Sequence, residues 1–190
     1  MRINIKEIKD ISIKEYREIL TIIECGNDSI ENNVKIISLL TDITEKDLLD
    51  YDYNSIIKLV EIVEGIIGKE ASKDINEVEI DGIKYDFDKR LDKMTTGMFI
   101  DLYNFTKDGE TIIDNLHIIS AILFREKKNG RLNKYDSEDV MARADIFNEK
   151  LSVSVAQNIC FFFLILRMKL LEKIVAFLEN KLKQEKVNMK

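Results

Sequence analysis

The sequence lacks proline and tryptophan entirely, and its 190 residues include one histidine, two cysteines and seven glycines. Proline and glycine are the strongest helix breakers, so their scarcity favours a helical chain. Cys25 and Cys160 lie far apart in apolar surroundings, and we favour two buried thiols over a disulfide. The single histidine, His117, has no ligand cluster around it, so we expect neither a metal ligand nor a general base.

An excess of positive charge is also absent. The formal net charge is −6, which argues against nucleic acid as the main partner, because that binding needs many lysines and arginines. The longest apolar run, Ile159 to Leu166, is far shorter than the ~20 residues of a membrane span. The first seven residues lack the apolar region of a signal peptide. We therefore expect no signal peptide, no transmembrane segment and no membrane partner.

Apolar residues recur at helical spacing along most of the chain. Ser12 and Glu15 have the spacing of a capping box and predict a helix start. Asn54 is predicted to cap a third long helix. Further helices are predicted from Thr95 or Thr96, from Ser137, and from Ser152 to about Lys186. Ahead of these, the alternation at Ile3 and Ile5 suggests a short strand.

The periodicity changes around Asp81 and Gly82. An Asp-Gly pair suits the positive φ angles of a type I′ turn and predicts a two-residue β-hairpin. In that register Ile80 faces Ile83, and Val78 faces Tyr85 on the same side. A lone hairpin is marginally stable in water, so its apolar face must pack on helices or on another strand.

Two stretches of the chain resemble one another at an offset of about 83 residues. The segment 11–19 aligns with 94–102 at an offset of 83 residues. The segment 33–38 aligns with 115–120 at an offset of 82 residues. Duplication is one explanation and a shared hydrophobic pattern is the other. We predict a mainly α fold of two quasi-repeated helical units, an intervening β-hairpin and a long C-terminal helix. The predicted divisions are 1–72, 73–150 and 151–190, the last packing on both units and on partners.

The spacing of Asp50, Asp52, Asn54 and Glu61 copies that of an EF-hand calcium loop. Ser55 stands at the hinge position that glycine normally occupies, and a helical stripe runs through the segment. We therefore favour a capped helix over calcium binding. No glycine-rich turn follows a strand, so no phosphate cradle is expected. The sequence predicts no cofactor, no metal site and no catalytic residues.

The one locally basic stretch is expected to form a loop around Asn129-Gly130. A solvated turn is the simplest interpretation, and an acidic partner surface or a phosphate backbone are the alternatives. Its candidate binding residues are Arg125, Lys127, Lys128, Arg131 and Lys134.

The C-terminal helix carries a stripe with the alternating four- and three-residue spacing of a coiled coil. We call this stripe the seam, and its positions are Leu164, Met168, Leu171, Val175, Leu178 and Leu182. Packing within the chain would explain its first part. Little else in the chain remains to cover its last turns, so we favour contacts with a partner there.

The order of these signals resembles that of small virion and assembly proteins of tailed bacteriophages. The similarity is a pattern over most of the chain, carried by the segments 13–16, 36–41, 48–49, 94–101, 115–123, 135–136, 151–156 and 161–163. It implies a structural component of a tail, connector or baseplate-like assembly and implies no catalytic residues. Such proteins often have proline in the basic loop, where this chain has Glu126 and Lys127.

From the resemblance we expect a non-enzymatic structural protein that packs in several copies against itself and other phage proteins. It would be found in the virion and the host cytoplasm. A transient tail-assembly chaperone is the alternative, and a helical adaptor of the bacterial cytosol is a third hypothesis.

Overall fold

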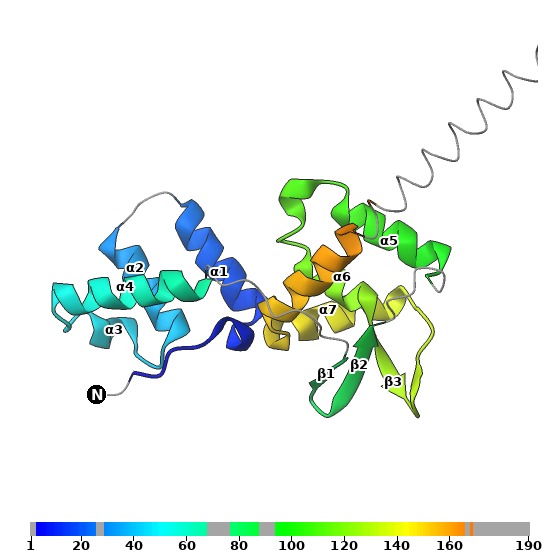
Figure 1. The fold of residues 1–190 in the computed structure, drawn as a ribbon, viewed down its shortest axis with the longest axis horizontal. Helices are drawn as coiled ribbons and strands as arrows, with labels where there is room; N and C mark the ends of the chain where they lie inside the picture. Colours follow the sequence, from blue (N-terminus) through cyan, green and yellow to red (C-terminus); the bar gives the residue numbers. More distant parts are fainter. Residues whose placement is uncertain (1–2, 26–28, 68–76, 88–93, 166–167, 169–190) are drawn as a thin grey trace, which may run out of the picture.

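The computed structural model describes residues 3–25, 29–67, 77–87, 94–165 and 168. These residues form two lobes that lie side by side along the long axis of the molecule (Figure 1). The first lobe is helical. The second combines helices with a small four-stranded antiparallel sheet. The expectation of a mainly α protein is therefore confirmed.

The first lobe contains a short 3-10 helix and four α-helices. Ser12 caps the first α-helix as predicted: its hydroxyl accepts from the Glu15 N–H, and its own N–H donates to the Glu15 carboxylate at 2.9 Å. This exchange satisfies backbone donors that a helix start leaves unpaired. The elements are η1 (Ile8–Asp10), α1 (Ile13–Glu24), α2 (Ile30–Leu40), α3 (Glu45–Leu48) and α4 (Tyr53–Ile67).

The start of α4 corrects one prediction. The helix begins at Tyr53, so Asn54 lies inside it and does not cap it. The Asp52 carboxylate accepts hydrogen bonds from the Ser55 N–H at 3.1 Å and from the Ser55 hydroxyl at 2.6 Å. Asp52 is the residue just before the helix, where a carboxylate both caps the N–H groups and complements the helix dipole.

The expected strand at Ile3 and Ile5 is also absent. Ile5 forms a single antiparallel bridge with Thr41, and no longer ladder involves these residues. The Lys6 N–H donates to the Leu40 carbonyl at 2.9 Å, so the segment runs extended along the end of α2. The alternating apolar residues here reflect burial of one side of an extended segment. That segment lacks the ladder of backbone hydrogen bonds that defines a β-strand.

The second lobe begins with the predicted hairpin and ends with the helix of residues 153–165. Its sheet has the order β1-β2-β3-β4, and all neighbouring strands are antiparallel. The elements are β1 (Glu77–Ile80), β2 (Ile83–Phe87), α5 (Thr96–Thr106), η3 (Gly109–Thr111), α6 (Leu116–Leu123), β3 (Phe124–Lys128), β4 (Arg131–Leu132) and α7 (Glu138–Lys150).

The first hairpin has the predicted register. Ile80 pairs with Ile83 and Val78 pairs with Tyr85. Asp81 has φ 53° and Gly82 has φ 75°, the positive values that a type I′ turn requires. The hairpin is not isolated, because β2 pairs with β3 on its other side.

The segment expected to be a basic loop is a second hairpin. β3 and β4 pair across a turn in which Asn129 has φ 52° and Gly130 has φ 75°. Asn-Gly supports the same type I′ turn as Asp-Gly. The flanking residues are mostly charged, so they lack the apolar alternation by which a strand is recognised in a sequence.

Aromatic rings fill the space between the sheet and the helices of the second lobe. Phe147 of α7 meets Tyr85 edge-on at 5.0 Å between ring centroids and Phe124 at 6.1 Å. Phe87 contacts Phe124 at 6.3 Å and Phe162 at 5.2 Å. These edge-to-face pairs tie β2, β3, α7 and the helix of residues 153–165 into one core.

The two lobes are joined by backbone hydrogen bonds between helix starts. The Ile13 N–H donates to the Leu151 carbonyl at 3.1 Å, and the Val153 N–H donates to the Ile11 carbonyl at 2.8 Å. Ile13 and Val153 each begin a helix, where the N–H has no partner within the helix itself. Each lobe thus provides a carbonyl acceptor for the first N–H of a helix in the other lobe. Ile11, Ile13, Leu151 and Val153 are all buried.

Candidate interaction surfaces

The helix of residues 153–165 is anchored on one side by the core of the second lobe. Phe163 is buried, and the Phe162 ring packs against Phe87. Cys160 is also buried, and burial raises the pKa of its thiol to about 11. At neutral pH this thiol is protonated and unreactive. The prediction of a buried thiol holds for Cys160 and is wrong for Cys25, which is exposed just after α1.

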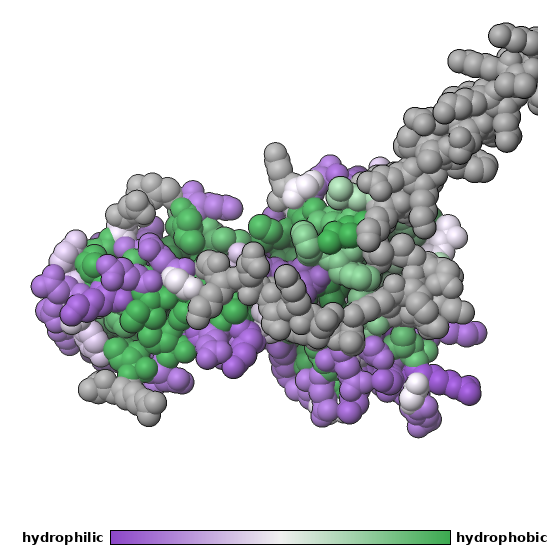
Figure 2. Space-filling view, in the orientation of Figure 1, coloured by the Kyte–Doolittle hydropathy of each residue, from purple (hydrophilic) through white to green (hydrophobic). Residues whose placement is uncertain are grey.

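One residue of this helix, Phe161, is exposed, and so is Met168 beyond it. Phe161 is 65% exposed and Met168 is 61% exposed. Seven residues separate the two positions in sequence, which is about two turns of an ideal helix. We call Phe161 and Met168 the C-terminal face. Figure 2 shows apolar side chains gathered on the second lobe where this helix crosses it.

The predicted seam begins at this face. Leu164 is half-buried and packs against the core, whereas Met168, one turn later, is largely exposed. The seam therefore changes from a covered to an uncovered position between these two residues. Its remaining positions lie outside the described residues: Leu171, Val175, Leu178 and Leu182.

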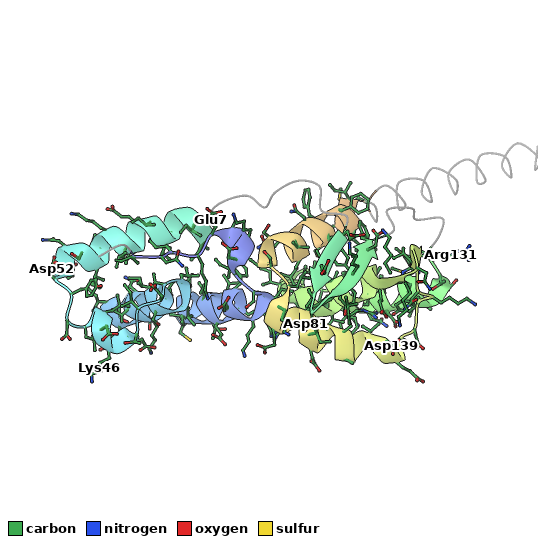
Figure 3. The ribbon with its side chains drawn as sticks, turned by 90° about the horizontal axis from the view of Figure 1, so that it is seen from below. Glu7, Lys46, Asp52, Asp81, Arg131 and Asp139 are labelled. Atoms are coloured by element: carbon green, nitrogen blue, oxygen red, sulfur yellow. The ribbon has the colours of Figure 1, made fainter. Side chains whose placement is uncertain are left out.

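A second uncovered apolar pair lies in the turn between α3 and α4. Leu49 is 71% exposed and Tyr53 is 66% exposed. Figure 3 shows Lys46 and Asp52, which flank this turn, at the far end of the first lobe from the second lobe. We call Leu49 and Tyr53 the N-lobe tip. Analysis of the sequence did not predict this pair.

Three aspartates, Asp47, Asp50 and Asp52, lie close to the N-lobe tip in sequence, as does Lys46. Hydrogen bonds from Ser55, chiefly from its hydroxyl, lower the pKa of Asp52 and keep it ionised at neutral pH. Asp47 accepts a hydrogen bond from the Thr44 hydroxyl at 2.7 Å. Asp50 lies between them in sequence, and no side-chain hydrogen bond or ion pair joins it to any described residue. The tip is therefore apolar and acidic at once.

Two cations of the predicted basic loop, Lys127 and Lys128, form ion pairs within the sheet. Lys127 of β3 lies 3.1 Å from Asp86 of the adjacent strand β2 and 2.8 Å from Glu77 of β1, the next strand beyond it. These contacts raise the pKa of Lys127 and lower that of Glu77. Lys128 pairs with Glu126 of its own strand at 3.0 Å.

The remaining basic residues of this hairpin differ in their surroundings. Arg125 is half-buried and donates to the Asn133 carbonyl at 3.1 Å. Arg131 and Lys134 are exposed, and neither forms an ion pair with a described residue. Two exposed cations beside a ladder of internal ion pairs are a small surface for a polyanion, which needs many unpaired charges.

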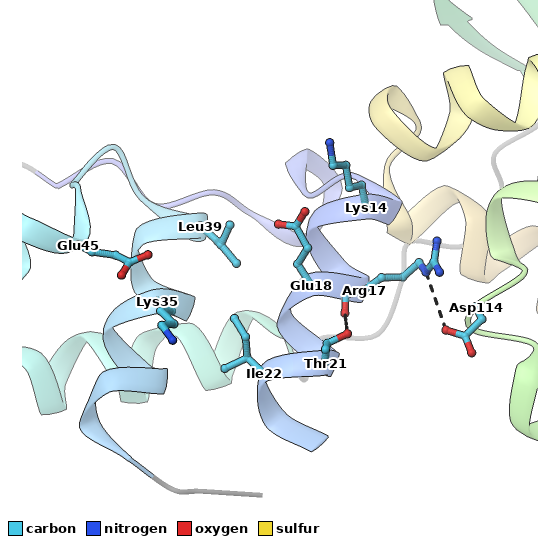
Figure 4. A pocket seen from close by; sticks show the side chains of 9 residues that line it. All are labelled: Lys14, Arg17, Glu18, Thr21, Ile22, Lys35, Leu39, Glu45 and Asp114. Carbon is cyan, nitrogen blue, oxygen red and sulfur yellow. Dashed lines mark hydrogen bonds and ion pairs between the residues drawn. The ribbon is translucent and has the colours of Figure 1, made fainter. Parts of the chain in front are cut away.

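A groove of about 530 Å³ lies between α1 and α2 (Figure 4). Ile22 and Leu39 give it apolar lining, and charged side chains stand around them. Two of its cations are already paired: Arg17 lies 3.9 Å from Asp114, and Lys14 lies 3.0 Å from Glu149. Both pairs link α1 to the second lobe, so these charges hold the lobes together.

His117 lies beside this junction on α6. It is half-buried, and burial lowers the pKa of its imidazole, helped by the nearby Arg17 guanidinium. Asp145 and Asp114 oppose the effect without reversing it. The imidazole is therefore neutral at pH 7.

The groups that could bind metal do not converge in the described part of the chain. No cluster of three or more histidine, cysteine or acidic side chains is found there. The segment with calcium-loop spacing is helical from Tyr53 to Ile67, so its backbone cannot wrap an ion. Among the described residues, no helix combines the length and apolar character needed to cross a membrane.

Comparison with known proteins gave no match: no protein-family model, curated protein or solved structure is significantly similar to this chain. The resemblance to tailed-phage proteins stays a prediction from the sequence pattern. Among the surfaces of the described residues, the C-terminal face and the N-lobe tip carry the most exposed large apolar side chains.

Proposed function

We propose that this protein is a non-enzymatic structural component of a tailed-phage particle, packed in several copies through its last helix. The observation that carries the proposal is the exposure of Met168, directly after a seam position that the core covers. An apolar side chain left in water at a heptad position favours association with another helix.

The sequence beyond Met168 supports the same proposal. Leu171, Val175, Leu178 and Leu182 continue the heptad spacing. A repeated apolar stripe of this kind is buried when two helices interdigitate their side chains. Copies of one chain carry the same stripe, so self-association is the simplest way to cover it. The seam would then serve contacts with itself and with other phage structural proteins.

We also propose that the two lobes contain quasi-repeated helical units. The caps of α1 and α5 support this. Ser12 accepts from the Glu15 N–H at 3.2 Å, and Thr95, 83 residues later, accepts from the Met98 N–H at the same distance. In each lobe this capped helix packs on a following helix, α2 or α6. Paired units of this type suit a protein that presents helix faces to neighbours.

A transient assembly chaperone is the alternative function. It would use the same seam but leave before the particle matures. A bacterial cytosolic adaptor is the third hypothesis, in which the seam binds a host protein. The structural role is favoured because a heptad stripe gives durable, extensive burial when copies pack together.

The seam can be tested by the paired change Leu171→Asp and Leu178→Asp. We expect a lower assembly mass in light scattering while the helical circular dichroism signal persists, because buried carboxylates oppose seam formation. The control is Lys173→Asn with Asn180→Asp. This pair has the same spacing and the same change in net charge, on the opposite side of the helix. An unchanged mass in the seam variant would refute the proposal.

The location can be tested by mass spectrometry of phage particles purified from cells that produce the protein. A structural component is expected at a fixed ratio to the other particle proteins. A chaperone is expected in infected lysate and absent from particles. Detection in neither, together with capture of one host protein by the seam, would favour the adaptor hypothesis and exclude the structural role.

A further inference from the structure

The two ends of the molecule carry exposed groups of opposite charge. The turn between α3 and α4 is acidic, and the second hairpin is basic. Figure 3 shows Asp52 and Lys46 at one end of the long axis and Arg131 at the other. The exposed carboxylates of residues 42–54 are those of Asp42, Glu45, Asp47, Asp50 and Asp52, and Lys46 is the single cation of that segment. The exposed cations of the hairpin are Lys128, Arg131 and Lys134.

Three of these charged groups have no ion-pair partner within the described part of the chain. Arg131 and Lys134 form no ion pair there, and the Asp50 carboxylate forms neither an ion pair nor a side-chain hydrogen bond. Lys127, by contrast, is paired within the sheet. Each end therefore has exposed charge that is available to another molecule. We call Arg131 and Lys134 the basic pair.

We infer that the N-lobe tip of one copy docks on the second hairpin of the next copy, around the basic pair. This inference rests on the proposed function, because it requires that copies of the chain associate, and it names the surface that each copy contributes. An acidic partner surface was one interpretation of the basic stretch in the sequence. The N-lobe tip lies in such a surface, on the same chain.

Apolar area adds to the charge at this contact. Leu49 is 71% exposed and Tyr53 is 66% exposed. The aliphatic stems of Arg131 and Lys134 can lie over these side chains while their charged ends meet the Asp50 carboxylate. The Arg131 guanidinium can also stack on the Tyr53 ring, a contact that arginine makes better than lysine.

The contact is small, since a few side chains on each copy take part. Interfaces of that size are weak on their own. Copies that the seam already holds together would form it as a second, effectively intramolecular contact, which strengthens the assembly without a large interface. The seam would thus supply most of the affinity, and the end contact would fix how successive copies are oriented.

Charge disfavours the symmetric pairings of the same surfaces. Tip against tip would bring the carboxylates of residues 42–54 together, and hairpin against hairpin would oppose Arg131 and Lys134 with their own copies. A contact within one chain is excluded because the two surfaces lie at opposite ends of the long axis (Figure 3). The favoured contact is therefore head-to-tail, which adds copies until a ring closes or a filament grows.

The test uses full-length chains in which Leu171→Asn and Leu178→Asn weaken the seam, so that the end contact is measured by itself. The tip variant adds Asp50→Arg, and the hairpin variant adds Arg131→Glu. Each change opposes like charges at the contact, and we expect each to raise the apparent Kd roughly tenfold or more in sedimentation equilibrium. The control is Glu64→Arg, which makes the charge change of Asp50→Arg at an exposed site about three turns further along α4. It should leave the Kd unchanged.

An equimolar mixture of the tip and hairpin variants is the decisive measurement. The tip variant keeps an intact hairpin and the hairpin variant keeps an intact tip, so one unmodified contact remains between unlike copies. We expect heterodimers with the Kd of the background, at concentrations where each variant alone is a monomer. Combining Asp50→Arg and Arg131→Glu in one chain exchanges the two charges, and we expect it to recover part of the affinity that either change removes.

The apolar part of the contact has its own test. Leu49→Ser with Tyr53→Ser should raise the apparent Kd in the same background by roughly tenfold. Ile62→Ser removes another exposed apolar side chain of α4 and is expected to have no effect. Arg131→Lys keeps the charge but loses the planar stacking group, so it should weaken association less than Arg131→Glu does. Circular dichroism confirms that each variant is folded.

The outcomes separate this inference from the proposed function. If either charge variant associates like its background, or if the mixture stays monomeric, the head-to-tail contact is wrong while the seam can still act. If the background is already a monomer up to its solubility limit but the unmodified chain assembles, the seam alone is responsible and the inference fails. If the unmodified chain is a monomer at every concentration, both proposals fail.

Discussion

The two lobes have different cores. Every buried apolar side chain described between residues 3 and 67 is isoleucine, leucine or valine. In the second lobe the centre is occupied by aromatic rings, and all four ring-to-ring contacts of the described residues lie there. The first lobe packs helices on helices, and the second packs helices both on one another and on a sheet.

This difference in core composition follows from the shape of the space between the packed elements. Helices in the first lobe approach closely, and branched aliphatic side chains interdigitate between them. In the second lobe a helix such as α7 lies over a twisted sheet, and wide, flat rings fill the space. Each ring buries ~150–250 Å² and gains from edge-to-face contact as well. The second lobe thus gains part of its buried area from a few large rings.

The largest expected effect comes from deleting one ring. Phe147→Ala removes a fully buried side chain that contacts both Tyr85 and Phe124, and we expect a loss of ~3–5 kcal/mol in the free energy of unfolding. Ile37→Ala in α2 is the matched change in the first lobe, with an expected loss of ~2–4 kcal/mol. Urea unfolding followed by near-ultraviolet circular dichroism measures both. Equal losses of unfolding free energy in the two variants would show that a core aromatic ring stabilises the protein no more than a core aliphatic side chain does.

A smaller effect is expected from the two corresponding helix caps. Ser12→Ala removes a reciprocal capping box beside the lobe junction, so we expect a loss of ~1–2 kcal/mol. Thr95→Ala removes one hydrogen bond to the Met98 N–H, and we expect ~0.5–1 kcal/mol. Thermal unfolding of both variants gives the comparison. A larger loss of stability for Thr95→Ala than for Ser12→Ala would contradict the view that the Ser12 cap also supports the junction between the lobes.

The smallest effect concerns pH and the region where the lobes meet. The pKa of His117 in the folded chain lies below its ordinary value of 6.5, so the unfolded chain binds the proton more readily. Its contribution to stability is present above pH 6.5 and is lost as pH falls through that value toward the folded pKa. Unfolding at pH 7.5 and 5.5 should therefore show a smaller decrease for His117→Gln than for the unmodified chain. The same decrease in both would refute this prediction.

Local chemistry made part of the fold predictable. Asp81-Gly82 determines the hairpin register because few residue pairs tolerate two positive φ angles, and Ser12 with Glu15 marks a helix start by side-chain chemistry alone. The prediction for Asn54 was wrong because Asp52, two residues earlier, is also a good capping residue, and its carboxylate accepts from the Ser55 N–H.

The surfaces were harder to predict than the elements. The heptad spacing located Met168, but periodicity does not tell whether an apolar stripe meets its own core, as Leu164 does, or solvent. The N-lobe tip was not predicted because Leu48 and Leu49 are the same residue type, and the sequence pattern does not show which of the two is exposed. The tight turn after α3 buries the first and exposes the second, a distinction that arises from tertiary packing.

The contact between the lobes also has a consequence for how the chain is made. The Ser152 hydroxyl donates to the Ile8 carbonyl, 144 residues earlier, next to the backbone pairing of Ile11 with Val153. A ribosome adds ~5–20 residues per second, so Ile11 and Ile13 emerge roughly 10–30 s before the segment that covers them. During synthesis, Ile11 and Ile13 thus stay exposed until the segment around Leu151 and Val153 has been made. The nascent chain has to avoid aggregation through these exposed apolar residues.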